Sequence, residues 1–140
     1  MSDFEAQERR ISEILGQDEI PGVDRDTLRT YLAYLKASLL FPCQVTGGED
    51  FGWEEYYLFG PGDKEEYEQL KKTKPSHKDS YELLEPDDDL DETPGVLVKV
   101  KRLSDKKTFV LPLADLEATD KASGNYQLLD DYSVWYVNWR

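Results

Sequence analysis

The sequence is poor in the side chains that most often perform catalysis or bind transition metals. Among its 140 residues there is one cysteine, Cys43, and one histidine, His77. A single cysteine excludes an internal disulfide and fits a reducing compartment, and one Cys with one His cannot build a structural zinc site. We expect His77, inside the polar run KKTKPSHKDS, to be a solvated imidazole. We expect Cys43 to be a small core residue, which argues against thiol catalysis.

Sequence motifs of enzymes are also missing. The chain has no glycine-rich phosphate loop, no nucleophile-elbow motif and no HExxH. Pairs of acidic residues are so abundant that no single pair identifies a two-carboxylate hydrolase. We therefore predict that the protein is not an enzyme.

Long apolar runs are absent. The longest, residues 37–41, is far shorter than the roughly 20 residues that a membrane span needs. The N-terminal MSDFEAQERR has no apolar segment typical of a signal peptide. The sequence thus predicts a soluble, cytoplasmic protein that does not enter a membrane.

Basic residues are scarce relative to acidic ones. Seventeen Lys and Arg stand against thirty Asp and Glu, which gives a net charge of −13. Such a surface repels phosphate backbones and anionic lipid, so nucleic acid and membrane surfaces are excluded as ordinary partners. It suits cations or basic proteins, and its self-repulsion favours a monomer.

The negative charge is concentrated in one segment. Residues 49–92 hold sixteen acidic residues and five lysines, whereas the rest of the chain holds fourteen acidic and twelve basic residues. A surface shaped only for solubility tends to intersperse the two signs. The concentration therefore points toward a function for this segment.

The length fits a single domain, residues 1–140, and the N-terminal third is typical of helices. Apolar residues predict a first helix over residues 3–15. A second helix, capped by Asp24 or Asp26, is predicted to run to about Leu39, because its leucines and Tyr31 recur at helical spacing. Pro42 ends it.

The pattern after Pro42 favours short strands. We predict strands over residues 43–46, 53–59 and 81–84, a short helix over 64–72, an acidic loop from Glu85 to Gly95, and a hairpin over 96–113. The aromatic-rich C-terminus is assigned a short helix. The fold class is then α+β: N-terminal helices packed on a small antiparallel β-sheet or half-barrel, with a short C-terminal helix.

Clustered carboxylates are the strongest candidate for a binding site. Calcium takes six to eight oxygen ligands, which carboxylates, carbonyls and water supply. The sequence therefore predicts Ca²⁺ as the bound ion. The candidate ligands are Asp50, Glu54, Glu55, Asp87, Asp88, Asp89, Asp91, Asp130 and Asp131.

These clusters differ in how they could act. The run from Asp87 is not an EF-hand, because Glu92 stands where the loop needs glycine and Val98 where it needs a bidentate glutamate. It could be an irregular ion-binding loop or a solvated acidic loop. Asp130 and Asp131 could bind metal, or could cap a helix that starts there.

Glu54 and Glu55 adjoin Trp53 and Tyr56 in one of the predicted strands. On a strand, one of the two carboxylates points inward or toward a neighbouring strand and the other faces solvent. An acidic residue placed in this way near a second acidic cluster could be a calcium ligand.

Four stretches together resemble the cyanobacterial calcium-binding CcbP family. They are YLAYLKASLLFPCQVTG, FGWEEYYLFG, LVKVKRLSDKKTFVLPLADLEATDK and NYQLLDDYSVWYVNWR, within residues 27–140. The resemblance implies a small acidic protein that binds and sequesters calcium without EF-hands and, in filamentous cyanobacteria, influences heterocyst differentiation. It assigns no ligand residue by residue, so the ligands above depend on charge clustering alone.

Two functions remain open from the sequence. The first is a buffer that sequesters cytosolic calcium through clustered acidic side chains. The second is an acidic protein-interaction module, of the immunity or nucleic-acid-mimic type, that caps a basic partner. The sequence identifies no regulatory protein partner.

Overall fold

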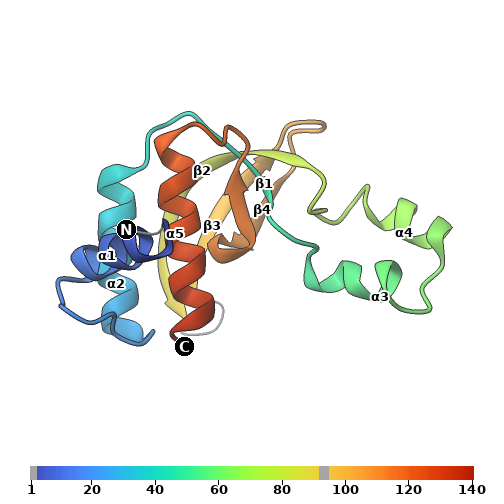
Figure 1. The fold of residues 1–140 in the computed structure, drawn as a ribbon. Coiled ribbons are helices and arrows are strands. Elements are labelled where there is room, and N and C mark those ends of the chain that lie inside the picture. The colour runs from blue at the N-terminus through green and yellow to red at the C-terminus, as the bar shows by residue number, and fades with distance from the viewer. Residues whose placement is uncertain (1–2, 92–94) are drawn as a thin grey trace.

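A computed structural model describes the backbone of residues 3–91 and 95–140 and the side chains of residues 3–84 and 95–140. Within this part of the chain, five strands form one open antiparallel sheet in the order β4-β3-β2-β1-β5 (Figure 1). The strands are β1 (Cys43–Gly47), β2 (Ser80–Asp91), β3 (Gly95–Arg102), β4 (Thr108–Pro112) and β5 (Leu116–Ala118). The predicted α+β class is confirmed, with an open sheet rather than a half-barrel.

Helices α1 (Asp3–Leu15), α2 (Arg25–Ser38) and α5 (Gly124–Asn138) lie together beside the sheet (Figure 1). Their apolar faces meet the buried face of the sheet, and Ile11, Leu28, Leu129 and Val98 are completely buried between these elements. The helices predicted over residues 3–15 and from Asp24 are confirmed. Periodic apolar residues predicted them correctly because each helix buries one face.

The start of α2 follows from its capping residues. The Asp24 carboxylate accepts a hydrogen bond from the backbone N–H of Thr27 at 2.8 Å, and the Thr27 hydroxyl accepts one from the Asp24 N–H at 2.8 Å. This reciprocal capping box satisfies backbone donors that have no partner inside the helix. It fixes the first turn of α2 and hence the direction in which the helix crosses the sheet.

Aromatic packing joins α5 to the other helices. The ring of Tyr31 stacks on Trp135 with centroids 5.0 Å apart and meets the edge of Tyr132 at 5.2 Å. The indole N–H of Trp135 donates to the carbonyl of Pro21 at 3.0 Å. The C-terminal helix therefore holds both α2 and the connection that precedes it.

A second small unit projects from the sheet. Residues 51–72, which we call the arm, contain the 3₁₀ turn η1 (Gly52–Glu54), helix α3 (Glu55–Leu58) and helix α4 (Lys64–Leu70). Figure 1 shows α3 and α4 extending away from α1, α2 and α5, on the far side of the sheet. The short helix predicted over residues 64–72 is confirmed as α4.

The strand predicted over residues 53–59 is wrong, because this segment is helical. The Glu54 carboxylate accepts the backbone N–H of Phe51 at 3.1 Å, which begins a helical turn. The rings of Trp53 and Tyr57 then pack on Tyr67 of α4, with centroids 5.7 and 5.6 Å away. Contacts within the arm outweigh the preference of aromatic residues for strands.

The acidic loop predicted from Glu85 is also wrong in part, because the backbone of β2 continues to Asp91. It pairs with β3 through Pro86 opposite Val98 and Leu90 opposite Val96. The register shifts on both sides of Pro86, and proline has no N–H to give to a sheet ladder. Pairing with β3 therefore holds this acidic segment in a strand, although its composition favours a loop.

The remaining predicted strands, the hairpin and the C-terminal helix are confirmed. Strand β1 and the hairpin of β3 and β4 occur where alternation predicted them, and residues 104–107 form the turn. The predicted C-terminal helix is α5, but it begins at Gly124 with Ser123 as its N-cap. Among the described residues, no helix combines the length and apolar character needed to cross a membrane.

Candidate metal centre

An acidic cleft lies where β1, β5 and α5 meet. It has a volume of about 320 Å³. We call it the acidic cleft. Five of its lining residues are carboxylates and none is Lys or Arg. The lining residues are Gly48, Glu49, Asp50, Ala114, Asp115, Leu116, Glu117, Asp130, Ser133 and Val137.

Hydrogen bonds fix the segments that form the cleft. The N–H of Gly48 donates to the backbone carbonyl of Asp115 at 3.0 Å, which joins the end of β1 to the turn η2 (Leu113–Asp115) before β5. The hydroxyl of Ser133 on α5 donates to the carbonyl of Ala114 at 2.8 Å. Strand pairing places Thr46 opposite Glu117. Three segments far apart in the sequence therefore present carboxylates to one space.

The glycine that ends β1 is required by close packing. A Cβ on Gly47 would lie 2.5 Å from the Cβ of His77 and 2.6 Å from its Cα. The N–H of Gly47 donates to the His77 carbonyl at 3.1 Å. This close approach lets the chain leave the sheet toward Glu49 and Asp50, which then reach the cleft.

The charge of the cleft is uncompensated at Asp115. Burial, and then the neighbouring charge of Glu49, raise the pKa of the Asp115 carboxyl above its ordinary value. Both causes disfavour the ionised form. A bound cation reverses this effect because it supplies the missing positive charge.

The oxygen donors of the cleft suit a hard cation, but in their present conformations the carboxylates are too far apart to coordinate one ion together. Within the described part of the chain, no three acidic, His or Cys side chains converge closely enough to hold a metal ion. Carboxylates, a hydroxyl and backbone carbonyls are the oxygen donors that calcium prefers. Binding therefore requires rotation of the exposed carboxylates toward a common point.

The cleft brings together Asp50 and Asp130 of the predicted ligands. Asp130 also accepts a hydrogen bond from the Gln7 side-chain amide at 2.9 Å. Sequence reasoning did not select Glu49, Asp115 or Glu117 as ligands. Glu49 adjoins Asp50 in the sequence, whereas only the pairing of β5 with β1 brings Asp115 and Glu117 to them.

Asp131 lies outside the cleft although it adjoins Asp130. Its carboxylate is buried and accepts hydrogen bonds from Arg10, Nε to Oδ2 at 2.9 Å and Nη2 to Oδ1 at 3.0 Å. Gln7 adds a third donor at 3.0 Å. The helix-capping role predicted for Asp130 and Asp131 is wrong, because α5 begins upstream at Gly124. Asp131 instead anchors α1 to α5.

Glu54 is completely buried in the arm, and both of its carboxylate oxygens accept hydrogen bonds from the protein. The donors are Phe51 N (3.1 Å), Tyr67 Oη (2.6 Å), Ser76 Oγ (2.8 Å) and His77 N (2.9 Å). The ring nitrogen Nδ1 of His77 also lies 2.9 Å from Oε1. The predicted solvated imidazole is therefore wrong, because His77 is half-buried against Glu54.

These hydrogen bonds stabilise the ionised form of Glu54. Burial alone raises its pKa, but the bonds from Tyr67, His77 and Ser76 outweigh burial and lower the pKa from 4.5 to about 2. Glu54 is thus a structural anion whose oxygens are already engaged. We leave it out of the proposed calcium ligands.

The other predicted ligands do not contribute to the cleft as described. Glu55 is exposed on α3 and does not line it. The backbone of Asp87, Asp88, Asp89 and Asp91 belongs to β2, and their side chains lie outside the described residues. Their role in ion binding stays a prediction.

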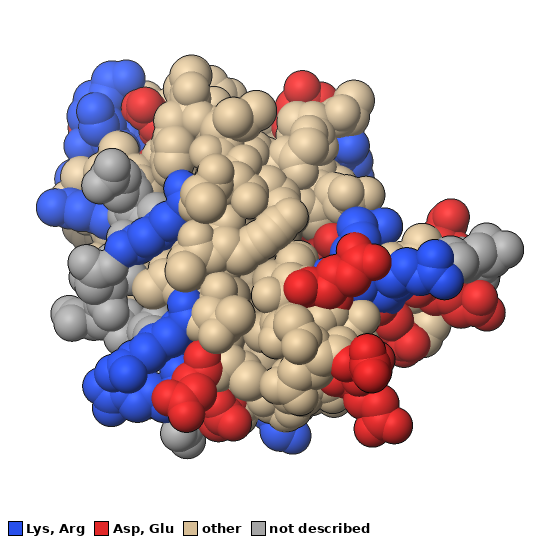
Figure 2. All heavy atoms as spheres, turned by 90° about the vertical axis from the view of Figure 1, so that its left-hand side faces the viewer, with Lys and Arg blue, Asp and Glu red and all other residues tan. Residues whose placement is uncertain are grey.

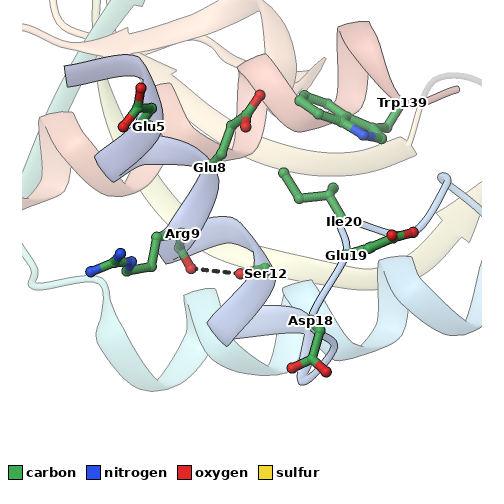
Figure 3. A pocket seen from close by; sticks show the side chains of 8 residues that line it. All are labelled: Glu5, Glu8, Arg9, Ser12, Asp18, Glu19, Ile20 and Trp139. Carbon is green, nitrogen blue, oxygen red and sulfur yellow. Dashed lines mark hydrogen bonds between the residues drawn. The ribbon is translucent and has the colours of Figure 1, made fainter. Parts of the chain in front are cut away.

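A wider hollow between α1 and the α1–α2 connection has mixed charge. Glu5, Glu8, Arg9, Ser12, Asp18, Glu19, Ile20 and Trp139 line its volume of about 550 Å³. Figure 3 shows Glu8 lying toward Trp139, whereas Arg9 and Asp18 point away from it. Its carboxylates diverge and its lining includes Arg9, whereas no basic residue lines the acidic cleft, so the acidic cleft is the better cation site.

Charge is unevenly distributed on the face shown in Figure 2. In Figure 2 most basic side chains gather along one edge of the face shown, and most acidic side chains gather toward the opposite edge, with uncharged atoms between. The net charge of −13 is therefore not distributed evenly over this face. Cation binding is expected only at particular acidic sites.

Comparison with known proteins supports the fold. No family model and no curated protein matches the sequence. The structure is similar to a solved calcium-binding protein in its calcium-binding form, with a TM-score of 0.58 and 20% identity, over 98% of this chain and 96% of that one. It is also similar to the crystal structure of Anabaena CcbP, with a TM-score of 0.57 and 19% identity, over 98% and 93%.

The chain thus shares its fold with these two solved proteins along nearly its whole length. The resemblance predicted from four sequence stretches is confirmed at the level of the fold. At this identity, similarity of fold does not carry over individual ligands.

Proposed function

We propose that the protein binds calcium in the acidic cleft and acts as a calcium buffer. The observation that carries the proposal is that five carboxylates, and no basic residue, line one cleft between β1, β5 and α5. The similarity of the whole fold to a protein solved in a calcium-binding form supports the choice of ion.

The proposed first ligands are Asp50, Asp115, Glu117 and Asp130, with Glu49 as a neighbouring charge. Because the exposed carboxylates must rotate and give up mutual repulsion, the affinity is expected to be modest, with Kd of roughly 1–100 μM, in the range of sensor and weaker sites. Calcium is expected to bind better than magnesium, since magnesium demands a tighter octahedron and loses its waters reluctantly.

Isothermal calorimetry tests this proposal. Chelator-stripped protein is titrated with calcium in ~0.1 M KCl and excess magnesium, a salt level that screens diffuse attraction. The variant Asp50→Asn/Asp115→Asn/Glu117→Gln is expected to bind calcium at least ~10-fold more weakly, because three charged ligands become neutral. A flat wild-type titration would overturn the proposal.

A matched control separates the cleft from general charge. The variant Asp18→Asn/Glu19→Gln removes acidic residues from the mixed-charge hollow and should leave calcium affinity unchanged. Equal loss in both variants would show diffuse ion attraction instead of a site. Heterocyst differentiation, cytoplasmic location and a monomeric state remain predictions of the sequence and its resemblance.

A further inference from the structure

The arm is held rigidly at its base. The guanidinium of Arg102, on β3, is almost completely buried. It donates to the carbonyls of Lys71 (3.0 Å), Lys72 (2.8 Å) and Lys74 (3.0 Å) and to the carboxylates of Asp79 (3.1 Å) and Asp105 (2.6 Å). These bonds tie the chain after α4 to the sheet. Glu54 ties η1 to α4 and to the chain before β2, so two buried charges fix the arm from both ends.

The interior of the arm is a small aromatic core. Trp53 contacts Tyr57 at 6.1 Å and Tyr67 at 5.7 Å between ring centroids, and Tyr57 stacks on Tyr67 at 5.6 Å. The indole N–H of Trp53 donates to the carbonyl of Pro75 at 2.7 Å. Aromatic packing and satisfied polar groups therefore give the projecting unit a fixed shape.

The tip of the arm exposes large apolar side chains. Tyr56 is 55% exposed, Leu58 36% and Phe59 78%. Tyr56 and Phe59 are three residues apart at the end of α3, so they lie on the same side of the helix. A rigid projection that holds aromatic side chains in water has the character of a binding surface, since folding gains nothing from their exposure.

The charge around the tip defines its partner. Residues 55–70 contain five carboxylates, Glu55, Asp63, Glu65, Glu66 and Glu68, and one lysine, Lys64. All five carboxylates are exposed. Lys71 pairs with Glu68 at 3.0 Å, and Glu66 accepts the Tyr57 hydroxyl at 3.0 Å, which places the acidic face of α4 beside α3. Anionic lipid and nucleic acid are repelled by this charge. A segment with apolar side chains on one face and Lys or Arg beside them complements both features.

We propose that the tip of the arm docks a basic amphipathic segment of another protein. Tyr56 and Phe59 supply the apolar contact, and Glu65 and Glu66 supply the charge that selects Lys or Arg. Because the arm is already fixed at Glu54 and Arg102, docking does not require it to fold first, which lowers the entropic cost of binding. This docking does not depend on the acidic cleft.

Fluorescence anisotropy with a labelled amphipathic helix of Leu and Lys tests the proposal. A scrambled peptide of the same composition is the matched probe, and both are measured in chelator, so that failure of calcium binding has no effect on the result. We expect the amphipathic helix to bind about tenfold more tightly than the scrambled peptide. Equal binding of the two peptides would overturn the proposal.

Variants locate the surface. Phe59→Ser changes a largely exposed side chain, and Tyr56→Ser removes a half-exposed ring that meets the Tyr57 ring edge-on at 5.0 Å. Circular dichroism checks that Tyr56→Ser/Phe59→Ser and the single variant Phe59→Ser are folded, and we expect the double variant to lose about tenfold or more in affinity for the amphipathic helix. Glu65→Lys/Glu66→Lys should lose a similar amount. The control Asp18→Lys/Glu19→Lys makes the same change in net charge elsewhere and should bind nearly as the wild type does.

Three results would contradict the proposal. The control could lose as much affinity as Glu65→Lys/Glu66→Lys, which would show attraction by net charge alone. Sedimentation could show self-association that Tyr56→Ser/Phe59→Ser abolishes, which would assign the tip to a second copy of this chain. Binding of wild type to vesicles of anionic lipid, lost in the same variant, would assign it to a membrane.

Discussion

The hydroxyl of Tyr67 donates a 2.6 Å hydrogen bond to the buried carboxylate of Glu54. This bond joins the first turn of the arm to α4, and the same carboxylate accepts donors from the chain that leads back to β2. A residue selected from the sequence as a metal ligand is therefore an internal anchor.

The substitution Glu54→Gln is expected to lower the free energy of unfolding by ~2–4 kcal/mol. It removes the charge that several buried donors share and turns an amide N–H₂ toward them. Urea denaturation measures the change. Glu55→Gln, on the exposed neighbouring residue, is the control and should change stability by less than ~0.5 kcal/mol. A Glu54→Gln variant as stable as its control would contradict the anchoring role.

The free energy of unfolding should decrease at low pH because Glu54 becomes protonated. Its pKa is lowered from 4.5 to about 2 in the folded protein, so its stabilising effect is complete above the unfolded pKa and is lost as the pH falls from about 5 toward 2. The urea midpoint, followed across this range, should decline less steeply in Glu54→Gln than in wild type. Parallel slopes in the two proteins would show that other carboxylates govern the acid transition.

Arg10→Met is expected to destabilise the protein by ~1–3 kcal/mol, because it leaves the buried Asp131 carboxylate without its cation. The estimate lies below that of a fully buried pair, since about a third of the Arg10 side chain is exposed. Thermal or urea unfolding measures it, and Arg9→Met, on an exposed neighbour, should have little effect. Comparable losses in both variants would assign the effect to helix α1 in general.

Calcium titrations should separate Asp131 from Asp130. The Asp131 carboxylate already pairs with Arg10, so the calcium Kd of folded Asp131→Asn should equal that of the wild type. Asp130→Asn removes a charge that lines the acidic cleft and should weaken binding by about threefold to tenfold, the range for one exposed charge near a divalent ion. The reverse order of effects would place the ion at Asp131, beside Arg10, and not in the acidic cleft.

Proton release should accompany calcium binding. The pKa of Asp115 is raised by burial and by Glu49, and a bound ion would lower it again. At acidic pH, where part of the Asp115 carboxyl is protonated, calcium binding should therefore release protons from it. The calcium Kd should therefore rise as the pH falls through the carboxylate range. Titrations in buffers of different ionisation enthalpy measure the protons released, and Asp115→Asn should reduce that number. Unchanged release in Asp115→Asn would remove it from the ligand set.

The sequence predicted best those elements whose stability is local. Helix α2 has a capping aspartate and a continuous apolar stripe, and the β3–β4 hairpin has alternating residues on both sides of a turn. The arm was predicted wrongly because its aromatic residues favour strands in isolation. In the folded protein, packing of Trp53 and Tyr57 on Tyr67 stabilises helical turns in this segment and outweighs that preference.

The amino-acid sequence by itself determined the acidity and the α+β class, because charge and periodicity are properties of the residues in order. The tertiary structure alone decided which carboxylates are available. Asp130 and Asp131 are neighbours in the chain and both accept a hydrogen bond from the Gln7 amide of α1. Only Asp131 also pairs with Arg10, whereas Asp130 also lines the acidic cleft. Contacts with a helix more than a hundred residues away therefore decide which of the two carboxylates is fully engaged, and the order of residues alone does not contain that information.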